Sequence, residues 1–141
     1  MDNRPLMLVI KHTYKEWTNY MRKLALEAGI PESYRMIIMY LSRNPGASQK
    51  DLAEYCEMTP AAVSQIIREM QLTGYINKET SLSDKRLVHL YLTEKGKSSA
   101  DRVRTKIHEA DKIITSAITR EKEEELIEAL NLLSDTIRRE L

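Results

Sequence analysis

The segment that begins at Thr59 combines small, amide, guanidinium and hydroxyl side chains on one face of an expected helix. The opposite, apolar face follows helical spacing, so the remaining positions are exposed: Ala61, Ser64, Gln65 and Arg68. Gln and Arg side chains form bidentate hydrogen bonds with adenine and guanine edges, and Ser and Thr hydroxyls suit bases or phosphates. Small residues near the helix start let it approach a groove closely. The alternative interpretation is an ordinary solvated helix face.

A second group of charges lies in the polar stretch between Ile76 and Leu87. Lys78 precedes a turn-prone run, and Asp84, Lys85 and Arg86 follow it. An Arg on a projecting hairpin can enter the narrow minor groove of A·T-rich DNA. We expect Asp84 to hold Arg86 extended through a charge-assisted hydrogen bond and Lys85 to contact phosphate. The alternative is a charged hairpin tip that only protects a strand edge.

Helical periodicity and turn residues predict the elements that carry these groups. A long helix ends at Gly29, a second ends at the turn Asn44-Pro45-Gly46, and Ser48 with Asp51 forms a capping box for a short third helix. Ser48, at that helix N-terminus, is a further candidate phosphate contact. Thr59-Pro60 starts the next helix, which Gly74 closes. Two short strands and two long helices complete the chain.

This order predicts a mainly α fold with a small β-hairpin wing. Residues 32–96 form a winged helix-turn-helix, and residues 5–28 and 97–141 form flanking dimerisation helices, in a single domain of residues 1–141. A small winged domain cannot cover the apolar stripes of the first and last helices. We therefore expect a homodimer that places two recognition helices about one DNA turn apart. The alternative is that these helices pack only within their own chain.

Composition restricts the other function classes. The chain has 141 residues, one Cys and a net charge of +1. The longest apolar runs are too short to span a bilayer, and a lone Cys suits a reducing compartment, so we expect a cytoplasmic protein with no membrane contact. We find no motif for catalysis or phosphate binding and expect neither an enzyme nor a cofactor. His12, His89 and His108 lack metal-ligand spacing, so no metal site is expected.

Five short motifs in this order resemble the multiple-antibiotic-resistance regulator (MarR) family. They are Asp51-Leu52-Ala53, Thr59-Pro60-Ala61-Ala62-Val63-Ser64, Gly74-Tyr75-Ile76, Ser83-Asp84-Lys85-Arg86 and Leu92-Thr93-Glu94-Lys95-Gly96. The resemblance implies a homodimeric transcription factor that binds palindromic double-stranded DNA, usually represses, and is often released by a small ligand. Two departures weaken the wing charge: Ser81-Leu82 replaces a frequent Asp-Pro, and Glu79 stands where a basic residue is common.

The first two helices are rich in aromatic and Met residues, which can line an apolar pocket. The candidates for binding a small aromatic effector are Tyr14, Trp17, Met21 and Met39. The resemblance implies such ligands between the dimerisation helices and the winged domain. The alternative is ordinary core and interface packing.

Two further alternatives remain open. Residues 48–93 hold five basic and six acidic side chains, so a winged-helix protein-interaction module that never touches DNA competes with the DNA-binding hypothesis. Cys56 is a candidate redox sensor. Redox-sensing relatives carry their Cys in the first helix, however, and we expect Cys56 to be a small buried residue.

Overall fold

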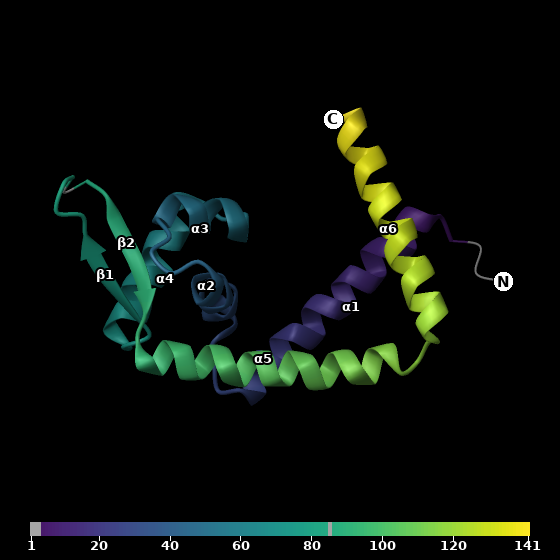
Figure 1. Ribbon diagram of the computed structural model, residues 1–141, viewed down its shortest axis with the longest axis horizontal. Helices are drawn as coiled ribbons and strands as arrows, with labels where there is room; N and C mark the ends of the chain where they lie inside the picture. Colours follow the sequence, from purple (N-terminus) through teal and green to yellow (C-terminus); the bar gives the residue numbers. More distant parts are fainter. Residues whose placement is uncertain (1–3, 85) are drawn as a thin grey trace. The chain divides into compact units, whose positions relative to one another are not determined.

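In the computed structural model, which describes residues 4–84 and 86–141, six helices and one hairpin follow the expected order (Figure 1). The winged helix-turn-helix fold is confirmed. The elements are α1 (Leu6–Glu27), α2 (Glu32–Arg43), α3 (Gln49–Cys56), α4 (Pro60–Leu72), β1 (Ile76–Thr80), β2 (Val88–Leu92), α5 (Glu94–Thr115) and α6 (Arg120–Glu140). The chain divides into two parts, one ending at Lys106 and one beginning at Ile107. The first helix thus belongs to the same part as the winged domain.

Local capping signals define the helix-turn-helix. The Ser48 hydroxyl accepts a hydrogen bond from the amide of Asp51, whose carboxylate accepts one from the Ser48 amide at 2.8 Å. Thr59 caps α4 by accepting from the amide of Ala62 at 3.2 Å, and Pro60 follows as the first helical residue. Both predicted helix starts are confirmed. Gly29 adopts φ +72° after α1, a conformation that ends the helix at little steric cost.

The hairpin is attached to the helices by a short third segment. β1 and β2 pair antiparallel, with Ile76 opposite Leu92 and Thr80 opposite Val88. Ala47, in the loop between α2 and α3, forms a bridge with Leu90. The Nδ1 atom of His89 lies 2.8 Å from the carbonyl oxygen of Gly46. These bonds fix the base of the wing next to the start of α3.

The core of the first part brings together residues from every element between α1 and the start of α5. Its fully buried side chains include Ile37, Leu52, Ile67, Leu90 and Val103. The apolar stripe expected from the spacing along α1 runs through Ile10, Tyr14, Trp17, Met21, Leu24 and Ala28, and its last three residues are buried. Tyr14 and Trp17, earlier in that stripe, are 67% and 39% exposed. The chain therefore covers only the C-terminal half of that stripe.

The second part, Ile107–Leu141, contains the end of α5 and all of α6. Thr119 caps α6 through a hydrogen bond from the amide of Lys122. No residue of α6 is buried, although Leu126, Leu130 and Ile137 follow one another on a single apolar face. Among the described residues, no helix combines the length and apolar character needed to cross a membrane.

Candidate nucleic-acid interface

Helix α4 presents the predicted polar face to solvent while its other face packs into the core. Ala61, Gln65 and Arg68 are exposed, whereas Val63, Ile66, Ile67 and Met70 are buried. This is the outcome expected from a 3.6-residue period with apolar positions at i, i+3, i+4 and i+7. The helix thus offers an amide and a guanidinium one turn apart.

Two hydrogen bonds orient polar side chains on α4. The Ser64 hydroxyl donates to Oε1 of Gln49, on α3, at 2.8 Å. This bond ties the two helices of the helix-turn-helix together, a role that sequence spacing did not indicate. The Gln65 amide donates to the Glu69 carboxylate at 3.3 Å on the exposed surface. Because this bond is long and solvated, a base edge can replace it.

The N-terminus of α3 already holds an anion from its own chain. The hydroxyl and the amide of Ser48 both donate to the Asp51 carboxylate at 2.8 Å. The pKa of Asp51 is lowered, first by the hydrogen bond from the Ser48 amide and then by that from its hydroxyl. The carboxylate thus takes both hydrogen-bond donors of Ser48, the N-cap residue of α3. A phosphate contact by Ser48 stays a prediction and would have to coexist with this carboxylate.

Hydrogen bonds to Ser81 and Asp84 build the tip of the wing. The Ser81 hydroxyl accepts from the amides of Ser83 and Asp84, and the Ser81 amide donates to the carbonyl of Leu87 at 2.9 Å. Ser81 therefore forms the turn at the position where proteins of the resembled family often have Asp-Pro. The Asp84 carboxylate accepts from the backbone amide of Arg86 at 2.9 Å.

The expected pairing of Asp84 with Arg86 needs one correction. Asp84 binds the main chain of Arg86 and shapes the loop, instead of holding the guanidinium, because a short Asp side chain reaches an amide two residues ahead more easily. Arg86 remains exposed. Lys85 lies outside the described residues.

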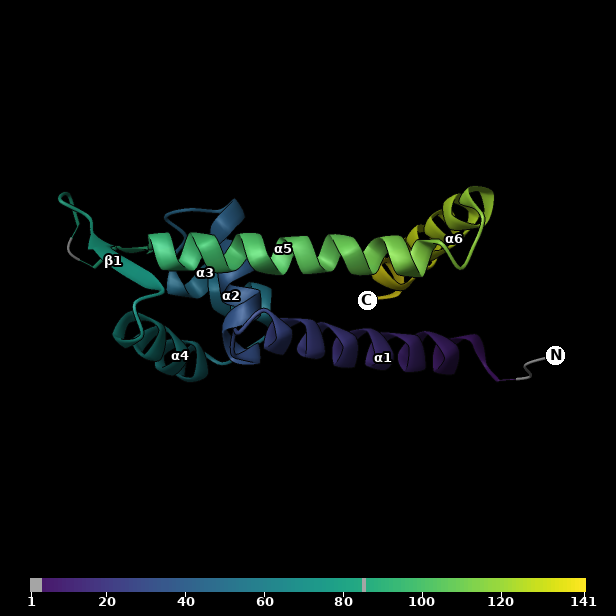
Figure 2. The same ribbon diagram turned by 90° about the horizontal axis from the view of Figure 1, so that it is seen from below.

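The two faces of the hairpin carry opposite charges. Cross-strand partners share a face, so Lys78, opposite Leu90, lies on the same face as buried Ile76. Glu79, opposite His89, lies on the other face. The β1 strand lies beside α4 in both ribbon views (Figures 1 and 2). The negative charge of Glu79, which would repel DNA phosphates, thus lies on the hairpin face opposite to that of Lys78.

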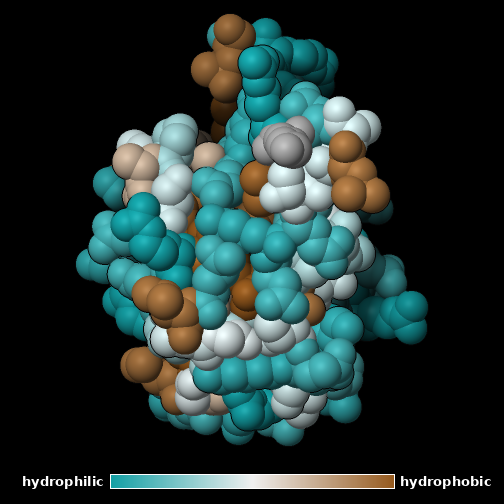
Figure 3. Space-filling model, turned by 90° about the vertical axis from the view of Figure 1, so that its left-hand side faces the viewer, coloured by the Kyte–Doolittle hydropathy of each residue, from teal (hydrophilic) through white to brown (hydrophobic). Residues whose placement is uncertain are grey.

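On the face that includes the wing, hydrophilic residues predominate and hydrophobic ones form separate spots (Figure 3). The exposed apolar residues of α4 and of the wing include Leu72, at the end of α4, and Leu82, in the loop between β1 and β2. A polar surface with isolated apolar residues is typical of nucleic-acid interfaces, whereas stable protein interfaces have an apolar centre.

Comparison with known proteins agrees with this geometry. The model of the MarR family matches residues 28–87, from the end of α1 to the tip of the wing. The HTH-type transcriptional regulator BilQ of Clostridium symbiosum is 24% identical over 122 residues, covering 86% of this chain and 85% of BilQ. A crystal structure of a MarR family transcription regulator superposes with a TM-score of 0.88 at 19% identity, covering 94% of this chain and 88% of the other. Over residues 28–87 the chain is similar to the MarR family.

Two transcriptional repressors whose structures contain a ligand or DNA are also similar. The HTH-type transcriptional repressor Rv2887 of Mycobacterium tuberculosis is 28% identical over 93 residues, 66% of this chain and 67% of the repressor. Its structure in complex with salicylic acid has a TM-score of 0.72 at 23% identity, covering 94% and 98% of the two chains. The transcriptional repressor CouR, bound to a 23-mer DNA duplex, has a TM-score of 0.79 at 18% identity and 92% coverage of both chains.

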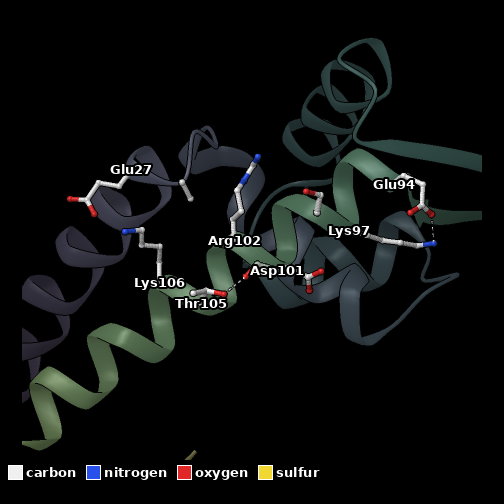
Figure 4. Close-up of a pocket in the computed structure, with 9 residues that line it drawn as sticks. Glu27, Glu94, Lys97, Asp101, Arg102, Thr105 and Lys106 are labelled. Carbon is white, nitrogen blue, oxygen red and sulfur yellow. Dashed lines mark hydrogen bonds and ion pairs between the residues drawn. The ribbon is translucent and has the colours of Figure 1, made fainter.

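The residues predicted to bind an effector do not come together in this chain. Met21 and Met39 are buried in the core, whereas Tyr14 and Trp17 are exposed along α1. A pocket of about 680 Å³ lies instead between the end of α1 and the first turns of α5 (Figure 4). Glu27, Ala28, Lys97, Ser98, Arg102 and Lys106 are among its lining residues. Sequence reasoning missed this pocket because it searched for aromatic residues.

Charged side chains from α5 dominate this pocket. Arg102 donates to the hydroxyl of Ser99 at 3.1 Å and extends toward the end of α1, while Lys106 points toward Glu27 (Figure 4). Lys97 pairs with Glu94 at 3.0 Å. The four-residue spacing of Arg102 and Lys106 places two cations on one helix face. This spacing is the sequence feature that could have indicated the pocket. Within the described residues, no cluster of His, Cys, Asp and Glu could hold a metal ion.

Proposed function

We propose that this chain is a sequence-specific DNA-binding transcriptional regulator that represses from a palindromic operator. The observation that carries the proposal is the exposed face of α4, where Gln65 and Arg68 lie one turn apart on a helix fixed by the Thr59 cap and by the Ser64–Gln49 bond. Bound DNA in the structure of CouR, which has the same fold, supports it.

Each predicted contact has a defined part in this proposal. Gln65 and Arg68 contact base edges in the major groove, and Ala61 allows the start of α4 to approach closely. Arg86 enters the minor groove beside it, oriented by the loop that Asp84 shapes. The remaining residues contact phosphates and set the register of the helix on the duplex: Ser48, Thr59, Ser64, Lys78 and Lys85.

The proposal includes a homodimer. The exposed fractions of Leu126, Leu130 and Ile137 on α6 are 51%, 44% and 46%, and those of Tyr14 and Trp17 on α1 are 67% and 39%. A monomer would leave these two apolar faces in water at a cost of about 25 cal/mol per Å². Pairing across a two-fold axis covers them and presents two α4 helices to two half-sites about 34 Å apart.

A small aromatic acid is the proposed effector. Arg102 and Lys106 line the pocket between α1 and α5 together with the acidic Glu27, Glu94 and Asp101, and the two cations suit a ligand carboxylate. The fold relative Rv2887 has been seen with salicylic acid. Such a ligand releases DNA if it binds more tightly to a dimer whose half-site spacing no longer matches the operator. Tyr14, Trp17, Met21 and Met39 then serve in packing.

A mobility-shift titration tests the proposed function. The duplex is the region upstream of the chain's own gene, and binding is measured at about 50 and 200 mM salt, together with retention on heparin. We expect a specific complex that weakens as salt rises, because phosphate contacts release counterions. Arg68→Ala should weaken this complex, whereas Arg104→Ala, an equal loss of charge on α5, should not. Absence of any complex at low salt would favour the protein-interaction module.

A further inference from the structure

Three consecutive carbonyl oxygens directly after α4 accept hydrogen bonds from residues at the start of α5. The Thr73 carbonyl accepts from Nζ of Lys95 at 2.7 Å, and the Gly74 carbonyl accepts from the hydroxyl of Thr93 at 2.6 Å. The Tyr75 carbonyl accepts from the Thr93 amide at 3.0 Å. Thr73, Gly74 and Tyr75 directly follow Leu72, the last residue of α4, so these bonds fasten the segment that leaves α4 to the start of α5.

These bonds between residues 73–75 and residues 93 and 95 form a joint between α4 and α5, and Lys95 makes a second contact in it. Its ammonium nitrogen lies 4.3 Å from the centre of the Tyr75 ring. That ring is buried and packs edge-on against Tyr34 of α2, with ring centres 5.3 Å apart. The side chain of Lys95 itself is exposed. The exposed ammonium group of Lys95 thus contacts both the C-cap of α4 and a buried aromatic ring. Its positive charge also interacts favourably with the negative C-terminal end of the α4 dipole.

We infer that Lys95 is a positioning residue for DNA binding, which holds α4 at a fixed angle to α5. The inference rests on the proposed function, because it concerns the helix that carries Gln65 and Arg68. A base-reading helix must be placed to within fractions of an ångström for bidentate bonds to form. The Thr59 cap and the Ser64–Gln49 bond hold the first half of α4, and Lys95 holds Thr73, the C-cap residue that directly follows the helix.

The joint also lies next to the pocket between α1 and α5. Glu94, Lys97 and Ser98, which line that pocket, flank Lys95 on the same turns of α5. Any displacement of these turns is therefore passed to the end of α4 through Lys95 and Thr93. No contact between Lys95 and DNA is needed for this effect.

Lys95→Met tests the inference, since Met keeps the unbranched stem and removes the cation. We expect operator affinity to fall about fivefold, a typical coupling effect for a residue outside the contact surface. The slope of log affinity against log salt should stay unchanged, because no phosphate contact is lost. Lys95→Arg should restore binding to within about twofold, since a guanidinium can donate to the same carbonyl and stack on the ring.

The matched control is Lys23→Met, which removes an exposed lysine paired with Glu27 at 3.8 Å on α1. It should leave operator affinity unchanged. An equal loss in both variants would assign the effect to net charge and overturn the inference. A salt slope reduced by about one in Lys95→Met would make Lys95 a phosphate contact, which also overturns it.

Amide hydrogen exchange separates this inference from the proposed function. The amides of Gly74 and Tyr75 donate to the carbonyls of Gln71 and Met70 at the end of α4. In Lys95→Met they should exchange faster, while the amides at the start of α4 should not change. If the wild-type protein binds no duplex, the proposed function fails. If amide exchange in Lys95→Met equals that of the wild type, Lys95 does not hold the end of α4 and the inference fails. If wild type binds and Lys95→Met binds equally well, only the inference fails.

Discussion

Gly96 packs directly against the carbonyl oxygen of Tyr75, so closely that a β-carbon at this position would overlap it. The same β-carbon would also lie 3.0 Å from a methyl group of Leu92. Gly96 is in the first turn of α5 and has no unusual backbone angle, so close approach, and not conformational freedom, requires the glycine. It allows the amide of Thr93 to reach Tyr75.

Gly96→Ala should therefore destabilise the fold, although alanine normally favours helix. We expect a loss of about 1–3 kcal/mol in the free energy of unfolding, because the displaced atoms are backbone and not a flexible side chain. Urea titration followed by circular dichroism measures it. Ser98→Ala, an exposed position two residues further on, is the control and should change stability by less than about 0.5 kcal/mol. Equal stability of Gly96→Ala and wild type would contradict the packing described.

Asp51→Asn should weaken the fold at neutral pH and not in acid. The hydrogen bonds from Ser48 lower the pKa of Asp51, so the charged carboxylate is favoured in the folded state. Its contribution is complete above the ordinary pKa of about 3.9 and is lost as pH falls through the lower folded value. We expect about 1 kcal/mol at pH 7, typical of an N-cap. Unfolding titrations at pH 7 and at about pH 2 should show this difference shrinking.

The control for the capping box is Glu54→Gln, which removes an exposed carboxylate 3.9 Å from Lys50 on the same helix. A solvated pair of this kind contributes little, so its substitution should have a small effect at either pH. If Asp51→Asn were as stable as wild type at pH 7, the cap would not be important.

Arg86→Ala should weaken operator binding most when the bases flanking each half-site are A·T pairs. The narrow minor groove of such flanks concentrates negative potential, and the wing presents Arg86 in a loop fixed by Asp84. We expect a loss of about 1–3 kcal/mol on A·T-rich flanks and less on G·C-rich flanks. Fluorescence anisotropy with the two duplexes measures it. Equal losses on both duplexes would show a phosphate contact instead of groove recognition.

Ile137→Glu should convert the proposed dimer into a monomer. Ile137 is 46% exposed on the apolar face of α6, and a carboxylate buried against a second copy would be costly. Light scattering at micromolar concentration should give half the wild-type mass, with weaker operator binding. Asn131→Glu introduces the same charge about 120° around the helix from Ile137 and should leave the mass unchanged. A wild-type chain that is monomeric under these conditions would end the proposal.

Oxidants should leave DNA binding unchanged. Cys56 is 8% exposed, and desolvation raises the pKa of its thiol, with the nearby Arg35 opposing this more weakly. A buried thiol reacts slowly because the thiolate is the nucleophile. We expect slow labelling by Ellman's reagent in native protein and fast labelling in urea, with equal operator binding before and after mild peroxide. Cys56→Ala should behave the same, and a peroxide effect lost in this variant would indicate redox sensing.

The elements of this fold could be predicted because their signals are local. A cap at Ser48 needs only Asp51 three residues later, and the cap at Thr59 needs only the amide of Ala62. The buried stripe of α4 depends on helical period alone. Burial of Cys56, the hairpin and the order of the helices were predicted on the same kind of evidence. For α1, period alone predicted one stripe and did not show that Tyr14 and Trp17 would remain exposed within one chain.

Contacts between residues distant in sequence were decided only by tertiary structure. Ser64 meets Gln49 across 15 positions and Lys95 meets Thr73 across 22, distances at which composition and period carry no information. The pocket depends in the same way on where the end of α1 lies against α5. Asp84 and Arg86 are close in sequence, yet the loop geometry selects the amide as partner. Local periodicity thus determined which groups this chain displays, and packing between elements determined which of them meet, because hydrogen-bond geometry depends on positions that only the folded core sets.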